Sequence, residues 1–366
     1  MKPSKKTSMM LLGIFLLLLV TLIGILLFVG QKSSKREKIG FIITGSIAEE
    51  GWNGMHYQGV SAACKALDVE LVVKENVKEF EGICEPAVEE LVKQGCKLII
   101  LTSYNYAEEV KELFAVYPDV SFYVTSVECH ADNVTSYFVR MYQVRYLAGI
   151  IAGLQTQTDQ IGYVAAMPNS EVNRGINAFT MGVRRVNPDA TVTVAWSNSW
   201  DDEEQERRQA KRLMEEVGVD VLTCHQNQSY SIEEAEKAGI YSIGYHHAPI
   251  DHSAKYLATV MADWKLTYEL IIRQYLRGNT ANMRVCWIGI DEDTVKLDNL
   301  SAAISREALV EIPKARNELL SGKDVFSGVI YDREGNLRCK ENQVIRDEVL
   351  LEQFDWYVEG VEFYDR

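Results

Sequence analysis

The chain has 366 residues, of which 47% are hydrophobic and 25% charged, and its formal net charge is −14. This length and apolar content suffice for two domains of ordinary size and exclude a wholly disordered chain. Past the first forty residues no basic run is longer than two residues, as at Arg184-Arg185 and Arg207-Arg208. An acidic chain of this kind disfavours nucleic acid as a partner.

An uncharged apolar run over residues 9–30 lies between two basic clusters. Its length is close to what a helix needs to cross about 30 Å of hydrocarbon. No small-residue cleavage site follows, and the cysteine of a lipid anchor is missing because the first cysteine is Cys64. We therefore expect residues 1–38 to be an uncleaved membrane anchor with a linker. Both flanks are basic, and the very short N-terminal tail favours a body on the extracytoplasmic face of the cell membrane.

Past the linker, short β-rich runs alternate with amphipathic stretches, which is typical of βαβ units. The strand-like runs are 39–44, 70–73, 98–102 and 121–125, and the helix-like stretches between them are 53–67, 83–94 and 107–117. The run Leu98-Ile99-Ile100-Leu101 is apolar throughout, as expected for a strand buried on both faces of a parallel sheet. These residues predict one doubly wound half with four strands.

The same alternation begins again after residue 160. The predicted strands are 161–165, 191–197, 219–223 and 240–245, separated by a helix through Ile176 and Phe179 and by helices at 202–217 and 232–238. We therefore predict an α/β fold with two doubly wound parallel-sheet lobes.

Ligands of open parallel sheets bind beyond the carboxyl ends of the strands. The residues at those positions are unusually aromatic and amide-rich. They include Trp52, Asn53, Ser103, Tyr104, Asn198, Trp200, His225, Gln226, Tyr245 and His246. Trp52 and Trp200 come from different lobes, so lobe closure would place a flat ligand between two rings.

Metal and catalytic motifs are missing from the sequence. Seven cysteines lack CxxC spacing, and His225, His246, His247 and His252 lack a zinc motif. There is no GxSxG elbow, no GxGxxG after a strand, no phosphate loop and no HExxH. We therefore expect a protein that is not an enzyme and that holds neither a metal nor a cofactor.

Several motifs along the chain belong together as a set. They are GW at 51–52, RYLAG at 145–149, IGYVA at 161–165, EVNRGINAF at 171–179, VNPDA at 186–190, Trp200, AGI at 238–240 and DWYVEGV at 355–361. With them, residues 38–366 resemble the basic membrane protein family of substrate-binding proteins, which includes purine nucleoside receptors serving ABC importers.

The resemblance implies a periplasmic-binding-protein fold of the first type, with three crossings between the lobes. The implied lobes are 39–140 plus about 265–300, and 141–264 plus about 301–366. It also implies an ABC permease and ATPase as partners and a purine held between the rings of Trp52 and Trp200. Stacking a base on an aromatic ring contributes about 1–3 kcal/mol. The alternative for each tryptophan is a place in the core.

Other candidate ligand contacts have equally strong structural interpretations. Asn53, Ser103 and Tyr104 offer donors and acceptors to a purine, but such residues also cap helices and form turns. Arg140 is placed to reach the cleft between the lobes or to form a structural ion pair. His225, Tyr245 and His246 complete the set of candidate binding residues.

One departure from the family pattern concerns the ligand. Nucleoside receptors of this family resemble one another in placing an acidic residue after the strand that here ends at Tyr245, and this chain has His246 and His247 there. A neutral imidazole accepts only one hydrogen bond, so recognition of two ribose hydroxyls is in doubt. We expect an adenine-like base, with nucleosides next. A sugar receptor of the same fold, or a sensory module for a separate signalling partner, remains open.

Overall fold

The computed structural model describes Thr21, Cys129 and residues 36–126, 131–248, 251–278 and 285–364. The chain divides into two units, residues 1–37 and residues 38–366. Apart from Thr21, the anchor expected at residues 9–30 lies outside the described residues. Within the described part of the chain, none of the helices has both the length and the apolar character that spanning a membrane requires.

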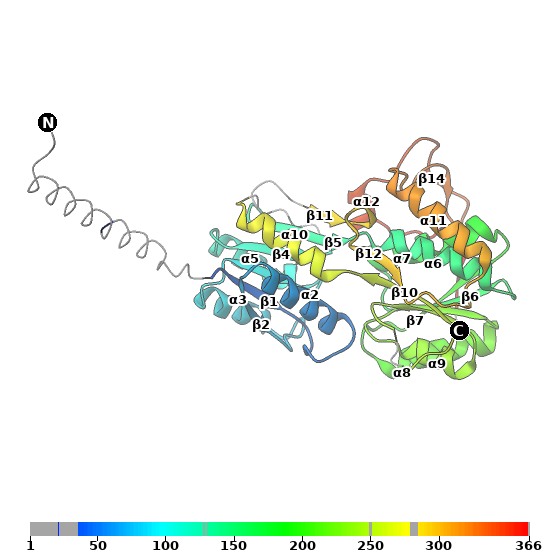
Figure 1. The fold of residues 1–366 in the computed structure, drawn as a ribbon, viewed down its shortest axis with the longest axis horizontal. Coiled ribbons are helices and arrows are strands. Elements are labelled where there is room, and N and C mark those ends of the chain that lie inside the picture. The colour runs from blue at the N-terminus through cyan, green and yellow to red at the C-terminus, as the bar shows by residue number, and fades with distance from the viewer. Residues whose placement is uncertain are drawn as a thin grey trace, which may run out of the picture. The chain divides into compact units, whose positions relative to one another are not determined.

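Residues 38–364 form two sheets with flanking helices (Figure 1). The first sheet has the strand order β11-β5-β4-β3-β1-β2, and all its pairs are parallel. Its strands are β1 (Lys38–Ile42), β2 (Glu70–Lys74), β3 (Leu98–Leu101), β4 (Ser121–Thr125), β5 (Val134–Val139) and β11 (Val285–Ile288). All four residues of β3 are fully buried, as its apolar sequence predicts. We call this sheet with its helices lobe 1.

The helices of lobe 1 are α2 (Trp52–Ala66), α3 (Cys84–Lys93), α4 (Tyr106–Glu109), α5 (Lys111–Val116) and α10 (Trp264–Leu276). Helix α3 buries Cys84, Val88 and Leu91 on one face, which is the pattern of an amphipathic helix. Helix α10 packs on α2, and a Cβ at Gly59 would lie 2.5 Å from the Cβ of Trp264. The single helix predicted at 107–117 is instead two short helices that meet at Val110.

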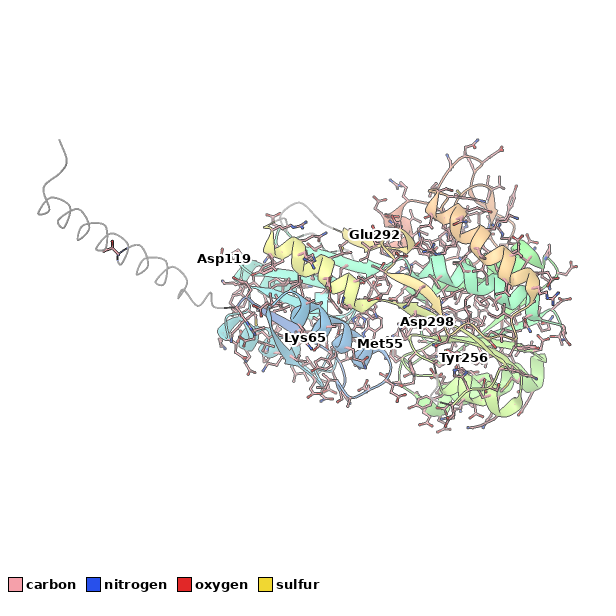
Figure 2. All side chains as sticks on the ribbon, viewed as in Figure 1. Met55, Lys65, Asp119, Tyr256, Glu292 and Asp298 are labelled. Carbon is pink, nitrogen blue, oxygen red and sulfur yellow. The ribbon has the colours of Figure 1, made fainter. Side chains whose placement is uncertain are left out.

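The second sheet has the order β12-β10-β9-β8-β6-β7-β15, and only the β10–β12 pair is antiparallel. Its strands are β6 (Gln160–Ala165), β7 (Thr191–Trp196), β8 (Val221–His225), β9 (Tyr241–Tyr245), β10 (Tyr256–Ala262), β12 (Val295–Asp298) and β15 (Val361–Phe363). We call this sheet with its helices lobe 2. Lys65 near the end of α2 and Asp298 at the end of β12 mark the two lobes in Figure 2.

The helices of lobe 2 and the remaining short elements follow the same chain order. They are α6 (Met141–Gln155), α7 (Ser170–Val186), α8 (Glu203–Arg212), η1 (Leu213–Val217), α9 (Tyr230–Ala238), η3 (Ile290–Glu292), α11 (Arg306–Leu320), β13 (Ile330–Tyr331), β14 (Leu337–Cys339) and α12 (Asp347–Glu352). The prediction of four strands in each half is incomplete. Strands β11, β10, β12 and β15 join the sheets from segments that come later in the chain than the βαβ alternation.

The chain passes between the sheets three times: from β5 to α6, from β10 to α10 and from β11 to β12. The amide of Arg140 in the first crossing donates to the carbonyl of Ile288 at 2.7 Å, and that of Asp263 in the second donates to Thr294 at 2.8 Å. The crossing segments are therefore bonded to one another. Because β12 pairs with β10, the division into lobes that we retain as a proposal places residues 295–298 in lobe 2.

The RYLAG motif allows a close contact between α6 and α7. A Cβ at Gly149 would lie 2.0 Å from the carbonyl oxygen of Phe179, and one at Gly182 would lie 2.0 Å from that of Tyr146. Real Cβ atoms do not approach other atoms so closely, so both helices need glycine at these positions. This contact fixes α7, whose first turn points to the carboxyl end of the sheet.

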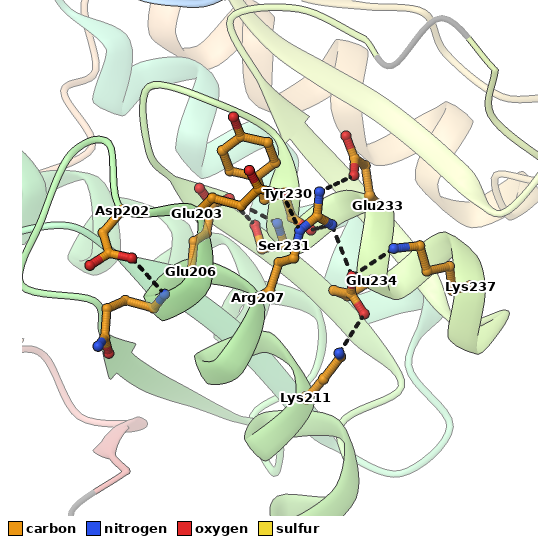
Figure 3. A network of polar contacts seen from close by, with 11 residues as sticks. Asp202, Glu203, Glu206, Arg207, Lys211, Tyr230, Ser231, Glu233, Glu234 and Lys237 are labelled. Carbon is orange, nitrogen blue, oxygen red and sulfur yellow. Dashed lines mark hydrogen bonds and ion pairs between the residues drawn. The ribbon is translucent and has the colours of Figure 1, made fainter.

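A polar network fixes the helices that follow β7 and β8 (Figure 3). Arg207 of α8 bonds to Glu203 at 2.8 Å, and to Glu233 and Glu234 of α9 at 2.6 and 2.9 Å. The buried carboxylate of Glu206 accepts from the amide and hydroxyl of Ser231, each at 2.8 Å. The loops before these helices carry Trp200 and His225, so the network holds two candidate ligand contacts in place.

Candidate ligand-binding site

Trp52, the first residue of α2, lies in a group of aromatic rings. Its ring centroid is 3.9 Å from that of His56, 5.5 Å from that of Trp264 and 5.4 Å from that of His246. The indole N–H donates to the carbonyl of Thr102 at 3.0 Å, which fixes the ring. Since His246 belongs to lobe 2, this ring contact joins the lobes.

The group continues along the strand ends of lobe 2. The ring of His246 is 3.7 Å from that of Tyr245, Tyr245 is 4.6 Å from His225, and His225 is 5.9 Å from Trp200. The structure thus brings together five of the predicted residues, Trp52, Trp200, His225, Tyr245 and His246. We call them, with His56 and Trp264, the aromatic group.

The first turn of α7 adds a charged pair beside the aromatic group. The Glu171 carboxylate accepts from the hydroxyl of Ser126 in lobe 1 at 2.9 Å and lies 3.7 Å from the His225 ring nitrogen Nε2. One turn later, the Arg174 guanidinium lies 5.6 Å from the ring of Phe138 and 5.2 Å from that of Trp287, both in lobe 1. Sequence reasoning missed both residues, although they stand in the EVNRGINAF motif directly after a predicted strand.

Burial sets the charge states of these groups. It lowers the pKa of His225 to about 4, and it lowers the pKa values of His56 and His246 as well, so the three imidazoles are neutral at pH 7. Burial opposes ionisation of Glu171, but His225, Arg174 and Ser126 together hold its pKa below the ordinary value. The site therefore contains neutral rings beside an ionised carboxylate.

The polar atoms of Asn53 and Ser103 bond within lobe 1. The Asn53 amide donates to Glu49 at 2.7 Å and accepts from the hydroxyl of Thr44 at 3.1 Å, while Ser103 donates to Glu79. Tyr104 is 44% exposed. These contacts match the structural interpretation of the three residues, and a role in ligand binding stays a prediction.

Arg140 forms an ion pair at the first crossing. Its guanidinium donates two hydrogen bonds to Asp347, at 3.0 and 2.5 Å, and lies 4.3 Å from the ring centroid of Trp287. A guanidinium held by both oxygens of a carboxylate has little capacity left for a ligand. The geometry favours the structural alternative for this residue.

A surface depression of about 670 Å³ lies elsewhere in lobe 2. Its lining includes Leu154 of α6, Arg185 of α7 and Val310 of α11. It contains no residue of the aromatic group, and its position along the side of the lobe differs from the strand ends where such folds bind ligands.

Comparison with known proteins supplies the family. Residues 36–323 match the family model described as Bmp, ABC transporter substrate-binding protein PnrA-like. A purine-binding protein of Brucella abortus is 31% identical over 353 residues, covering 94% of this chain and 99% of its own length. A Haloferax volcanii protein, provisionally named an ABC transporter glucose-binding protein, is 28% identical over 337 residues, covering 91% of this chain and 82% of its own.

The fold also matches solved structures. A transcriptional activator of the comK gene from Bacillus halodurans superimposes with a TM-score of 0.69 at 22% identity, covering 78% of this chain and 98% of its own. This likeness confirms the two-lobe α/β architecture of the periplasmic binding proteins. Taken with the family model, which spans most of the chain, it gives the class: the protein belongs to the PnrA-like family of ABC transporter substrate-binding proteins, which are binding proteins and not enzymes.

Proposed function

We propose that this protein is the extracytoplasmic receptor of an ABC importer and captures a purine base or nucleoside, with an adenine-like base as the first candidate. The observation that carries the proposal is the aromatic group, in which Trp52 of lobe 1 meets His246 of lobe 2. Aromatic rings suit a purine because every base has a π face. The purine-binding relative from Brucella abortus, aligned over nearly the whole chain, supports the same ligand class.

Capture proceeds by closure of the lobes. The contacts between Trp52 and His246 and between Ser126 and Glu171 join the two lobes directly. A ligand that stacks on one ring in the open form gains the second ring and the polar contacts only on closure. It therefore shifts the equilibrium toward the closed form by its differential affinity for that form.

The proposal includes the N-terminal anchor and the transporter. The uncharged run over residues 9–30 would hold the body at the membrane, close to a permease that works with an ATPase. The closed form would be the one that docks on the permease. A sugar receptor remains the alternative, because the relative from Haloferax volcanii carries a glucose-binding name.

Equilibrium dialysis of the full-length chain in detergent micelles tests the proposal. Labelled adenine is competed with purine bases, nucleosides, pyrimidines and sugars. Competition by purines alone supports the proposed class and ranks base against nucleoside. Binding of labelled glucose with no binding of any purine would overturn the proposal in favour of a sugar receptor.

Replacing either tryptophan with alanine is expected to weaken purine binding. Loss of one stacking ring removes about 1–3 kcal/mol, so Trp52→Ala and Trp200→Ala should each reduce the affinity about tenfold in dialysis. Tyr331→Ala is the matched control, because Tyr331 is 49% exposed on β13 and outside the aromatic group. Unchanged affinity in both tryptophan variants would refute stacking.

His246→Asp is expected to raise the affinity for a nucleoside relative to its base. Position 246 follows β9 with a φ of 66°, a conformation that aspartate tolerates well, and a carboxylate there can accept from two ribose hydroxyls. The measurement is the ratio of the adenosine and adenine dissociation constants. His252→Asp, at an exposed position, is the control. An unchanged ratio in His246→Asp would place this residue outside the ribose site.

A further inference from the structure

Two buried arginines near the aromatic group have no acidic partner. Arg145 of α6 is 0% exposed and Arg174 of α7 is 2% exposed. Neither forms an ion pair with any residue in the described ranges. The printed side-chain hydrogen bonds are from Arg145 to the Thr223 hydroxyl at 3.5 Å and from Arg174 to the Leu350 carbonyl at 3.1 Å. Both acceptors are neutral, so both positive charges are left without a counter-charge in contact.

Both guanidiniums lie against rings of the site. That of Arg145 is 4.0 Å from the ring centroid of Tyr245, whose ring in turn contacts those of His225 and His246. That of Arg174 faces Phe138 and Trp287 of lobe 1. Arg145 thus approaches the aromatic group from lobe 2, and Arg174 approaches at the boundary between the lobes.

The charges around the two arginines do not cancel. Glu171 supplies one negative charge, and Arg140 is neutralised by Asp347. The histidines are neutral at pH 7, as described above, and burial also keeps Tyr163 and Tyr245 protonated. The titratable groups facing the arginines from α6, α7, the crossings and the strands are Arg140, Tyr142, Tyr163, Glu171, Cys224, His225, Tyr245 and His246. With two guanidiniums and one unpaired carboxylate, an excess of one positive charge is buried here.

Hydrogen-bond donors are also in excess. In the described part of the chain, the buried atoms Nε and Nη2 of Arg145 and Nη2 of Arg174 lack a hydrogen-bond partner, as do the hydroxyls of Tyr163 and Tyr245. Burying a charged donor without an acceptor is costly, and such groups are normally paired. The complement of this surface is a ligand that is rich in acceptors and carries negative charge.

On the basis of the proposed function, we infer that the preferred ligand is an oxopurine of the xanthine or uric acid class, bound as its monoanion in contact with Arg174 and within the field of Arg145. A ring N–H beside carbonyl groups is acidic, and nearby positive charge favours its ionised form. Carbonyl oxygens and the anionic ring offer charge-assisted acceptors to a guanidinium. Adenine has no carbonyl group and stays neutral in this range. The Gly51-Trp52 motif bears on base against nucleoside and not on ring substituents, so the inference refines the adenine-like candidate.

Binding by the unmodified full-length chain is the first test. Xanthine is expected to bind at least about tenfold more tightly than adenine in equilibrium dialysis, as one charge-assisted contact would give. Bound xanthine should show the ultraviolet spectrum of its anion at a pH where free xanthine is mostly neutral. From about pH 8 to about pH 6, its affinity should fall about tenfold while that for adenine stays constant, because binding then requires loss of a proton.

Arg174→Met tests the contact itself. It should reduce the affinity for xanthine about tenfold or more and that for adenine less than about threefold, since only the anion loses a charge-assisted bond. Arg208→Met removes the same charge from an exposed position of α8 and should change neither affinity. Thermal unfolding of the unliganded variants checks that they fold.

The outcomes separate the two proposals. Adenine bound as tightly as xanthine, or xanthine bound with the spectrum of the neutral molecule, would overturn the anionic oxopurine and leave the purine receptor intact. No binding of any purine would overturn both.

Discussion

Gly51→Ala is expected to reduce ligand affinity about 100-fold while leaving the unliganded protein as stable as before. A Cβ at position 51, just before α2 in lobe 1, would lie 1.9 Å from the carbonyl oxygen of Asn227 in lobe 2. That oxygen belongs to the backbone, so no change of side-chain rotamer relieves the clash. Overpacking of this kind costs about 1–3 kcal/mol, and here the cost falls only on the closed form.

The measurement is ligand affinity by equilibrium dialysis, with small-angle scattering to compare the closed fraction in the two proteins. Ala48→Ser serves as the control, because Ala48 is exposed in the same loop. A Gly51→Ala protein that binds with normal affinity would show that the contact with Asn227 is not part of the ligand-bound form. A protein that is less stable without ligand would show that the methyl group disturbs lobe 1 itself.

Asn177→Ala is expected to lower the free energy of unfolding by about 3 kcal/mol, because it leaves two buried backbone groups unpaired. The Asn177 amide of α7 donates to the carbonyl of Trp356 at 2.8 Å and accepts from the amide of Val358 at 3.1 Å. Asn173, one turn earlier, donates to the carbonyl of Phe354 at 2.9 Å. These bonds tie α7 to a C-terminal segment beyond residue 323, where the family model ends.

Urea unfolding followed by tryptophan fluorescence measures the change. Asn317→Ala is the matched control: Asn317 is exposed on α11, and its replacement should change stability by less than about 0.5 kcal/mol. If Asn177→Ala unfolds at the same urea concentration as the unmodified chain, the C-terminal segment does not contribute to the cooperative unit through this residue.

The sequence predicts those parts of the fold that depend on local pattern. The run at 98–101 forms a fully buried strand because its residues are apolar on both faces. The glycines of RYLAG and of α7 lie where two helix backbones touch. Trp52, Tyr245 and His246 come together because the strand-end rule depends only on the strand direction and on the doubly wound topology.

The rest depends on contacts between distant segments. Nothing local marks β11 and β12 as members of different sheets, because the third crossing between them is read only from their pairing partners. The pairing of Arg140 with Asp347 depends on where the C-terminal segment returns. Glu171 and Arg174 were overlooked because the strand-end rule was applied to loops, whereas these side chains stand in the first turn of the following helix.

The crossing segments suggest why one scaffold can serve chemically different cargoes. The backbone bonds from Arg140 to Ile288 and from Asp263 to Thr294, with the Arg140–Asp347 pair, join the linkers through atoms that are not members of the aromatic group. The motion and the recognition chemistry thus use largely separate residues. Substitutions at the strand ends can accumulate without altering the hinge, so selection can exchange one nutrient for another while the transporter continues to receive the same moving part.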